Sequence, residues 1–314
     1  MKSQHFIPSS GVPQGSSLAT LLFAIFINDL AIELGNSALF FADDVKLITE
    51  IKSSQDVLSM QQQINKVVNW CNLNNIDLNI SKCAILSYYK SKNPVIVDYF
   101  IQNQLIQRVS VFRDLGVYFD TALTFKQHIS EIATNAFKSA GFIMRNCGSF
   151  SNIQTLKILF NTLVRSKLEY ASTVWSPYKK YQIAVLESVQ RRFLKFLYLK
   201  KNGRYPQRGC NQNALLHEFG MEALEQRRTV QDVKFISGLC RANIDCSFLL
   251  GRIDFYVPRI NSLARATFYI RTAKRDSKKY SPLNRMCTTV NSCRDVLDIF
   301  NVDPTKITLK SLQM

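Results

Sequence analysis

The sequence predicts an α+β protein in which a small mixed sheet with two packed helices precedes an all-helical region. Short runs rich in β-branched and aromatic residues occur before about residue 120. After residue 123, apolar residues recur at helical spacing over long segments. The chain has 314 residues, of which 46% are apolar, so it can bury a core of one large domain or two ordinary ones.

The N-terminal segment as far as Leu73 is expected to contain two helices and a hairpin. GVPQGSS supplies turn residues and a serine cap for a buried helix from Ser17 to about Leu34. SALFFADDVKLIT, residues 37–49, predicts a strand, a tight turn and a second strand. A capping-box spacing from Ser53 to Asp56 opens another helix that should end near Leu73.

Further strands and then helices should follow. Strands are predicted from Asp77 and from Leu105, the second bent at Gly116, and together they complete one mixed sheet. The turn-rich stretches beyond Leu123 separate four candidate helices, at 125–146, 152–171, 180–199 and 213–242.

Basic residues concentrate in the later part of the chain. Residues 1–100 carry seven lysines, no arginine and eight acidic residues, a net charge of −1. Residues 101–314 carry the other basic and acidic side chains, and their net charge is +18. This asymmetry predicts a polyanionic partner, with nucleic acid the first candidate and a basic surface kept for solubility the alternative.

One segment concentrates cations among aromatic rings. VQRRFLKFLYLKKNGR, residues 189–204, interleaves arginine and lysine with phenylalanine and tyrosine on one predicted helix. An ordinary amphipathic helix whose basic side chains extend to solvent would have the same pattern. The nucleic-acid interpretation assigns contacts with the phosphate backbone to Arg191, Arg192, Lys195, Lys200 and Lys201.

The cysteines and the apolar runs favour an intracellular protein without a membrane partner. Eight cysteines are scattered without a CxxC pair, which is unlike a disulfide scaffold or a zinc site. The two Cys-x5-Cys spacings, Cys240/Cys246 and Cys287/Cys293, have no accompanying histidine. The longest apolar run, Leu18 to Ile27, is about half of what a bilayer-spanning helix needs.

Asp43 and Asp44 are the clearest candidates for chemistry. Two carboxylates held close together repel each other unless one is protonated or a divalent cation neutralises them. A hairpin tip could direct both towards Mg²⁺, as in two-metal phosphoryl transfer. A solvated turn is the alternative.

Five ordered blocks support the chemical interpretation through a family resemblance. GVPQGSSLATLLFAIFINDL from Gly11, followed by FFADDVKL, resembles the reverse transcriptases of jockey-type retrotransposons that lack long terminal repeats. Three further blocks match in the expected order: WCNLNNIDLNISKC from Trp70, FRDLGVYFDTALTFKQHI from Phe112 and LVRSKLEYASTVWSPY from Leu163. The resemblance covers roughly residues 4–200.

The resemblance implies an incomplete right-hand polymerase palm over residues 1–122 and a helical thumb over 123–200. Residues 201–314 would form a basic helical region of unknown role. Asp43 and Asp44 would be catalytic ligands of Mg²⁺ or Mn²⁺. The other roles that it implies are nucleotide and template binding by Pro13, Gln14, Gly15, Ser16 and Lys82, and holding of the primer end by Leu115 and Gly116.

The implied partners are an RNA template, a DNA primer or RNA/DNA duplex, and deoxynucleoside triphosphates. The family's need to reach chromosomal DNA implies a nuclear location. Members of the family carry a third aspartate several dozen residues before the GVPQGS block, whereas this chain begins ten residues before Gly11. We therefore expect a truncated polymerase fragment that is inactive alone. Ala19-Thr20 replaces the usual Gly-Pro, a change of small effect.

Three alternatives remain open from the sequence. The chain could be a nucleic-acid-binding module that has kept its basic helices but lost catalytic activity. It could be an enzyme completed by a partner chain that donates the missing palm strand. It could also be a transposon relic without function.

Overall fold

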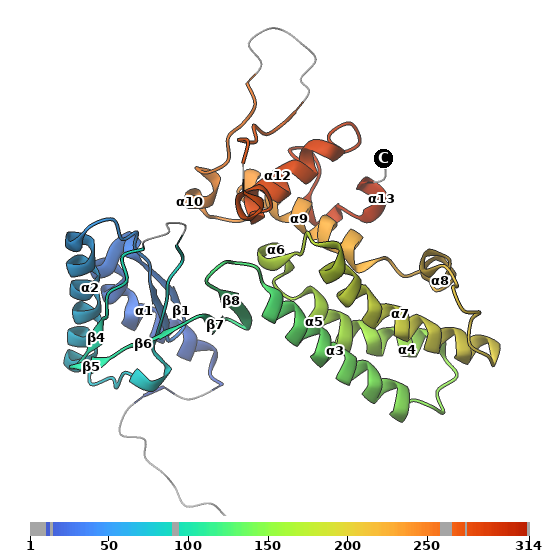
Figure 1. Cartoon of the computed structure of the whole chain (residues 1–314), viewed down its shortest axis with the longest axis horizontal. Coiled ribbons are helices and arrows are strands. Elements are labelled where there is room, and N and C mark those ends of the chain that lie inside the picture. The colour runs from blue at the N-terminus through green and yellow to red at the C-terminus, as the bar shows by residue number, and fades with distance from the viewer. Residues whose placement is uncertain (1–10, 13–14, 90–93, 258–265, 274, 313–314) are drawn as a thin grey trace, which may run out of the picture. The chain divides into compact units, whose positions relative to one another are not determined.

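The structure is a computed structural model that describes residues 11–12, 15–89, 94–257, 266–273 and 275–312 (Figure 1). The chain divides into two compact units, residues 1–112 and 113–314. Helices and strands both contribute, which confirms the α+β class at this level.

Unit 1 begins with the predicted helix, hairpin and helix. Helix α1 spans Ser17–Leu34, and its cap Ser16 accepts a hydrogen bond from the Leu18 backbone N–H at 3.3 Å. Strands β1 (Ala38–Phe41) and β2 (Asp44–Leu47) pair antiparallel. Helix α2 spans Ser54–Leu73. The Ser53 hydroxyl accepts from the Asp56 N–H, while the Asp56 carboxylate accepts from the Ser53 N–H, so the predicted capping box is confirmed.

The prediction of one mixed sheet is wrong for the described residues. They form four separate two-stranded sheets. Besides β1–β2, the pairs are β3 (Ala84–Leu86) with β6 (Gln107–Val109), β4 (Phe100–Ile101) with β5 (Gln104–Leu105), and β7 (Val111–Asp114) with β8 (Val117–Asp120). Only β3–β6 is parallel among the described pairs of unit 1, and several strands have only two or three residues.

Helix α1 was predicted to be buried, and this is wrong for most of its length. Leu30 and Leu34 are its buried residues, packed with Trp70 of α2, whereas Leu21 and Ile25 are 56% and 64% exposed. By length and composition, residues 17–37 could also cross a membrane, contrary to the estimate from the apolar run. A single helix of this kind is weak evidence for a membrane span.

Three helices predicted for the middle of the chain are confirmed in unit 2. Helix α3 spans Lys126–Asn146 and helix α7 spans Lys180–Asn202. The segment predicted as 152–171 comprises α4 (Ile153–Phe160), a π-helical turn (Asn161–Arg165) and α5 (Ser166–Glu169). These elements and the short α6 (Ser172–Trp175) surround one apolar core with Phe160, Trp175 and Phe193 at its centre.

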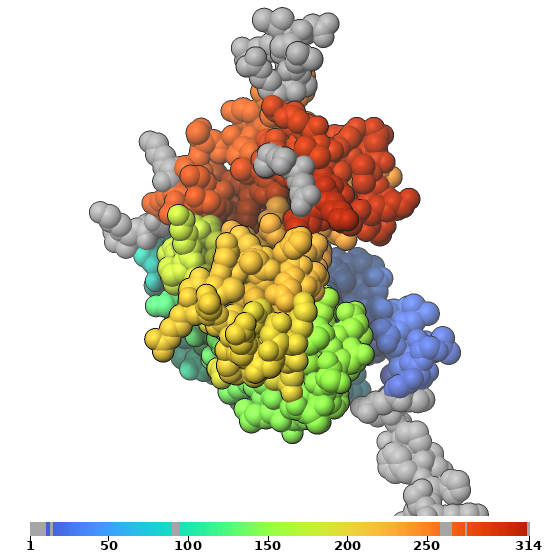
Figure 2. All heavy atoms as spheres, turned by 90° about the vertical axis from the view of Figure 1, so that its right-hand side faces the viewer, coloured from blue at the N-terminus to red at the C-terminus, as the bar shows by residue number. Residues whose placement is uncertain are grey.

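The predicted helix 213–242 is two helices, α8 (Gln212–Glu218) and α9 (Leu224–Cys240). Gly220, at φ 56°, ends the first because a left-handed residue cannot continue a right-handed helix. Helix α9 contacts α5, α6 and α7, which precede it in the chain, and α12 (Pro282–Cys293) and α13 (Leu309–Leu312), which follow it. It also contributes to a second apolar core, which includes Leu249 of α10 (Ser247–Leu250). The short helix α11 (Asp276–Lys279) precedes α12, and these C-terminal segments appear in orange and red in Figure 2.

Candidate functional site

The two predicted catalytic aspartates lie at the tip of the β1–β2 hairpin. Phe41 and Asp44 form the last pair of the ladder, so Ala42 and Asp43 make the two-residue turn between the strands. Ala42 adopts a left-handed φ of 51°, a conformation that costs a residue with a side chain about 1–2 kcal/mol. The turn is thus specified by the packing of the strands beneath it.

Apolar side chains on one face of the hairpin hold it on the helices of unit 1. Phe40, Val45 and Leu47 pack against the cluster that contains Leu30 and Trp70. The alternation of half-buried and exposed residues along β1 is what this one-sided packing requires. The indole N–H of Trp70 also donates to Asp29 Oδ1 at 2.9 Å and thereby joins α2 to α1.

The chemistry available at the tip is that of two unpaired carboxylates. Asp43 and Asp44 are both exposed, and neither carboxylate has a hydrogen-bond or ion-pair partner among the described residues. Within those residues, no group of three or more His, Cys, Asp or Glu side chains comes close enough to hold a metal ion. Two adjacent hard oxygen donors fit a Mg²⁺ ion as part of its ligand set.

The predicted nucleotide-binding residues are only partly described. Pro13 and Gln14 lie outside the described residues. Gly15 has a φ of +82°, which favours glycine, and Ser16 caps α1. Lys82 is exposed at the end of a 3₁₀ turn, Ile80–Lys82, which directly precedes β3.

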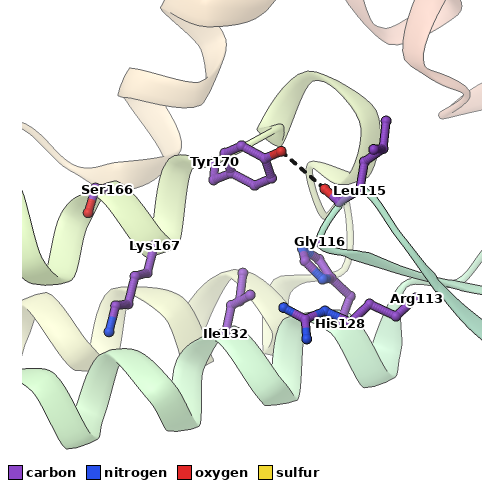
Figure 3. Close-up of a pocket in the computed structure, with 8 residues that line it drawn as sticks. All are labelled: Arg113, Leu115, Gly116, His128, Ile132, Ser166, Lys167 and Tyr170. Atoms are coloured by element: carbon purple, nitrogen blue, oxygen red, sulfur yellow. Dashed lines mark hydrogen bonds between the residues drawn. The ribbon is translucent and has the colours of Figure 1, made fainter. Parts of the chain in front are cut away.

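The predicted primer-holding residues form the tip of the β7–β8 hairpin. Leu115 and Gly116 both have positive φ values, 44° and 83°, as the two central residues of a hairpin turn often do. The Tyr170 hydroxyl donates to the Leu115 carbonyl at 3.1 Å (Figure 3). A Cβ on residue 116 would lie 3.3 Å from Tyr170 Cε1, so glycine allows this close approach.

A pocket of about 420 Å³ lies beside this tip, entirely within unit 2. Residues of the hairpin, of α3 and of the α5 region line the pocket. They are Arg113, Leu115, Gly116, His128, Ile132, Ser166, Lys167 and Tyr170 (Figure 3). The lining contains two cationic side chains and no carboxylate. Such a pocket is suited to an anion.

His128 is the buried polar group of the pocket, with 1% of its surface exposed. Its Nδ1 accepts a hydrogen bond from the Tyr118 N–H at 3.4 Å, so the proton of the neutral ring belongs on Nε2. Nε2 has no partner among the described residues. Burial, together with repulsion from Arg113, lowers the pKa of His128 to about 4, and the ring is therefore neutral at pH 7.

The five basic residues predicted on α7 differ in their surroundings. Arg191 Nε donates to Gln212 Oε1 at 2.6 Å, Lys200 bonds the Gly148 carbonyl, and Lys201 forms a 2.8 Å ion pair with Glu218. Arg192 and Lys195 are exposed and have no such partner in the described part of the chain. Their contact with nucleic acid stays a prediction.

Sequence reasoning missed Arg113, His128, Lys167 and Tyr170 as possible site residues. All four lie in blocks that carried the family resemblance, FRDLGVYFDTALTFKQHI and LVRSKLEYASTVWSPY. These blocks could therefore have pointed to the four residues as candidates for a site. Arg113 and Lys167 are nevertheless far apart in the chain, and their shared pocket depends on tertiary packing.

Comparison with known families shows which proteins the first part of the chain resembles. The family described as reverse transcriptase (RNA-dependent DNA polymerase) matches residues 1–138. These residues resemble reverse transcriptases. The predicted resemblance to reverse transcriptases of retrotransposons without long terminal repeats is confirmed.

Individual relatives agree with this resemblance. The RNA-directed DNA polymerase from mobile element jockey of Drosophila melanogaster is 27% identical over 133 residues, which are 40% of this chain and 14% of that protein. The probable RNA-directed DNA polymerase from transposon X-element of the same organism is 24% identical over 206 residues, or 63% of this chain and 22% of that protein. The chain therefore spans only a small part of the length of these two polymerases.

A shorter relative also matches. An uncharacterized protein of Caenorhabditis elegans is 28% identical over 110 residues, covering 33% of this chain and 55% of that protein. No solved structure matched the chain.

Proposed function

We propose that this chain forms the part of an RNA-directed DNA polymerase that supplies two metal-binding carboxylates and holds the primer–template duplex. The observation that carries the proposal is the exposed pair Asp43 and Asp44, without partners among the described residues, at a hairpin tip inside the reverse transcriptase match. Two adjacent exposed carboxylates can offer hard oxygen ligands to an external divalent cation.

Unit 1 corresponds in this proposal to part of a polymerase palm. The packing of β1 and β2 on α1 and α2 fixes the position of Asp43 and Asp44 at the hairpin tip, while their carboxylates stay in solvent. Lys82, exposed before β3, would attract the pyrophosphate of an incoming deoxynucleoside triphosphate by its charge. The helices α3 to α7 of unit 2 would form the thumb that follows the duplex backbone.

Asp43 and Asp44 would hold Mg²⁺ or Mn²⁺ through their carboxylate oxygens. The ions of a polymerase activate the attacking hydroxyl and stabilise the leaving oxygen in phosphoryl transfer. The residues of this chain contribute negative charge at the turn and a rigid hairpin to present it. Exposure of the turn leaves room for the triphosphate and the primer end.

Primer extension by the full chain tests the proposal. Wild type, Asp43→Asn, Asp44→Asn and the control Asp77→Asn are compared on an RNA template with Mg²⁺ or Mn²⁺. Asp77 is also an exposed acid of unit 1, so its substitution makes the same charge change away from the hairpin. Where wild type extends the primer, extension should fall at least about 100-fold in the turn variants and persist in the control, because each turn variant loses a ligand of the reacting centre. Equal, measurable extension by all four proteins would contradict the role of the turn, whereas extension by none of them is the result expected of a fragment that is inactive alone.

Mn²⁺ binding, followed by electron paramagnetic resonance, tests the metal role independently of turnover. Asp43→Asn and Asp44→Asn should weaken binding, while Asp77→Asn should not. If the variants bind Mn²⁺ as tightly as wild type does, the turn is not a metal site.

A second candidate function is duplex binding without catalysis, and the basic charge of the later residues and the cationic pocket favour it. It predicts duplex binding that weakens steeply with salt and does not change in Asp43→Asn. Binding without a salt slope would mean that the +18 of residues 101–314 is ordinary surface charge.

A further inference from the structure

The pocket beside Leu115 and Gly116 has features that holding a primer end by the hairpin tip does not use. We propose that this pocket binds one phosphodiester group of a nucleic-acid strand, with Arg113 and Lys167 supplying charge and His128 Nε2–H donating a hydrogen bond. The inference rests on the proposed function, and it assigns the contact to particular side chains of unit 2.

The charge of the lining selects an anion. Arg113 and Lys167 are both exposed, and neither forms a salt bridge among the described residues. Lys167 Nζ donates to the neutral Ser139 hydroxyl at 2.7 Å, which fixes its direction without neutralising it. Arg113 lies over the Tyr118 ring, with 5.7 Å from Cζ to the ring centroid. Both cations thus retain their charge for a ligand.

The unpaired donor in the pocket favours a ligand with acceptor oxygens. His128 is held by the Tyr118 N–H on one nitrogen and by edge-to-face packing on Trp175, with ring centroids 5.0 Å apart. Its Nε2–H is left without a partner in the described part of the chain, although the residue is buried. A buried donor without a partner destabilises the fold, so an acceptor entering the pocket would offset that cost.

The neutral state of His128 makes it a donor rather than a third charge. At pH 7 the ring donates through Nε2 and adds no positive charge to Arg113 and Lys167. A phosphodiester has one negative charge and two free oxygens, and these oxygens can accept hydrogen bonds from the two cations and the neutral donor.

Tyr170 acts as a positioning residue. Its hydroxyl donates a hydrogen bond to the Leu115 carbonyl at 3.1 Å, and its ring lies against Gly116. The hydrogen bond keeps the hairpin tip over the α5 end of the pocket. The same tip that would hold a primer end therefore borders the phosphate site, and one strand can reach both.

The test measures binding of the full chain to a fluorescent primer–template duplex across a salt series. Arg113→Gln and Lys167→Gln should each weaken binding and lower the logarithmic salt slope by about 1, because each removes one phosphate contact. Lys310→Gln, an exposed lysine of α13 outside the pocket, is the control for loss of general positive charge.

Duplexes with one neutral methylphosphonate at successive primer positions locate the contact. With wild type, one position should weaken binding more than its neighbours do. In the Arg113→Gln/Lys167→Gln double variant, that position should lose its special effect. A flat scan with wild type, or an unchanged scan with the double variant, would overturn the pocket assignment.

His128→Phe separates the hydrogen bond from charge. It keeps a ring on Trp175 but removes the donor, so we expect weaker duplex binding with an unchanged salt slope. Thermal unfolding of each variant checks that the fold is retained, and His128→Gln, which keeps a donor, should recover part of the affinity. If both variants bind as wild type does, His128 has no contact with the ligand.

Inorganic phosphate distinguishes the two possible sources of the anion. At matched ionic strength, millimolar phosphate should compete no better than chloride for a phosphodiester site; selective competition that is lost in Lys167→Gln would mean a free-phosphate site and contradict the proposal. The proposed function and the pocket assignment can be told apart by these measurements. No duplex binding by wild type would contradict the proposed function, whereas equal duplex binding by wild type and the pocket variants would contradict only the pocket assignment.

Discussion

Arg285 and Asp232 form a two-pronged salt bridge that joins α12 to α9. Arg285 Nε lies 2.7 Å from Asp232 Oδ2, and Nη2 lies 3.1 Å from Oδ1. Their side chains are 14% and 3% exposed. Arg285 Nη2 also donates to the Thr173 carbonyl at 2.6 Å, so one guanidinium connects three segments of unit 2.

Asp232→Asn is expected to destabilise the fold by about 3–5 kcal/mol, because it leaves the Arg285 charge buried without its counter-charge. Urea unfolding measures the change. Asp295→Asn is the matched control, since the Asp295 side chain is 82% exposed and its pair with Arg294 should contribute less than about 1 kcal/mol. Similar losses in both variants would show that burial does not decide the strength of this pair.

The stability of the chain should rise with pH between about 4 and 6.5 through His128. Its pKa is about 4 in the fold against the ordinary 6.5, because burial and then Arg113 disfavour the charged ring. The unfolded chain therefore binds more protons in this window. The contribution of His128 to the free energy of unfolding amounts to about 3 kcal/mol. It is fully present above pH 6.5 and is lost as the pH falls through 4.

Urea unfolding at a series of pH values checks this expectation. His128→Phe should show a flatter pH dependence between 4 and 6.5 than wild type, whatever its stability at pH 7. Parallel profiles for the two proteins would mean that His128 titrates alike in the folded and unfolded chains.

Gly116→Ala should lower stability by about 1–2 kcal/mol, because residue 116 has a φ of +83° and a new Cβ would lie 3.3 Å from Tyr170 Cε1. Gly148→Ala is the comparison: a Cβ there would lie 3.7 Å from the Arg145 carbonyl oxygen, an ordinary contact. Thermal unfolding should place the Gly148 variant close to wild type. Equal melting temperatures for both variants would argue against a strained turn.

Two positions on α1 should respond differently to truncation. Leu30→Ala should cost about 2–5 kcal/mol, because Leu30 is 1% exposed in the cluster with Trp70. Ile25→Ala should change stability by less than about 0.5 kcal/mol, because Ile25 is 64% exposed. Denaturant unfolding measures both, and a large loss at Ile25 would reveal packing on the exposed face of α1.

Local signals in the sequence predicted a large part of the fold. The Ser53–Asp56 capping box, the Ser16 cap and the paired strands around Asp43 depend on neighbours within a few residues, so pattern and propensity were sufficient to find them. The split between α8 and α9 has a local cause in Gly220, but an isolated glycine is also tolerated within helices.

The sheet and the burial of α1 could not be predicted in the same way. Strand propensity indicates that a segment is extended, but the partner of each strand depends on the rest of the fold. The apolar composition of α1 suggested burial all round, whereas only the face with Leu30 and Leu34 meets α2 and the β1–β2 hairpin.

The sequence by itself determined the resemblance to reverse transcriptases, the hairpin that carries Asp43 and Asp44, and most of the helices, because ordered motifs and local hydrogen bonds carry that information. Only the tertiary structure decided that Arg113, His128 and Lys167 share a pocket and that Arg285 reaches Asp232. Contacts between residues this far apart in the chain form when helices pack around a common core, and packing is a property of the whole fold.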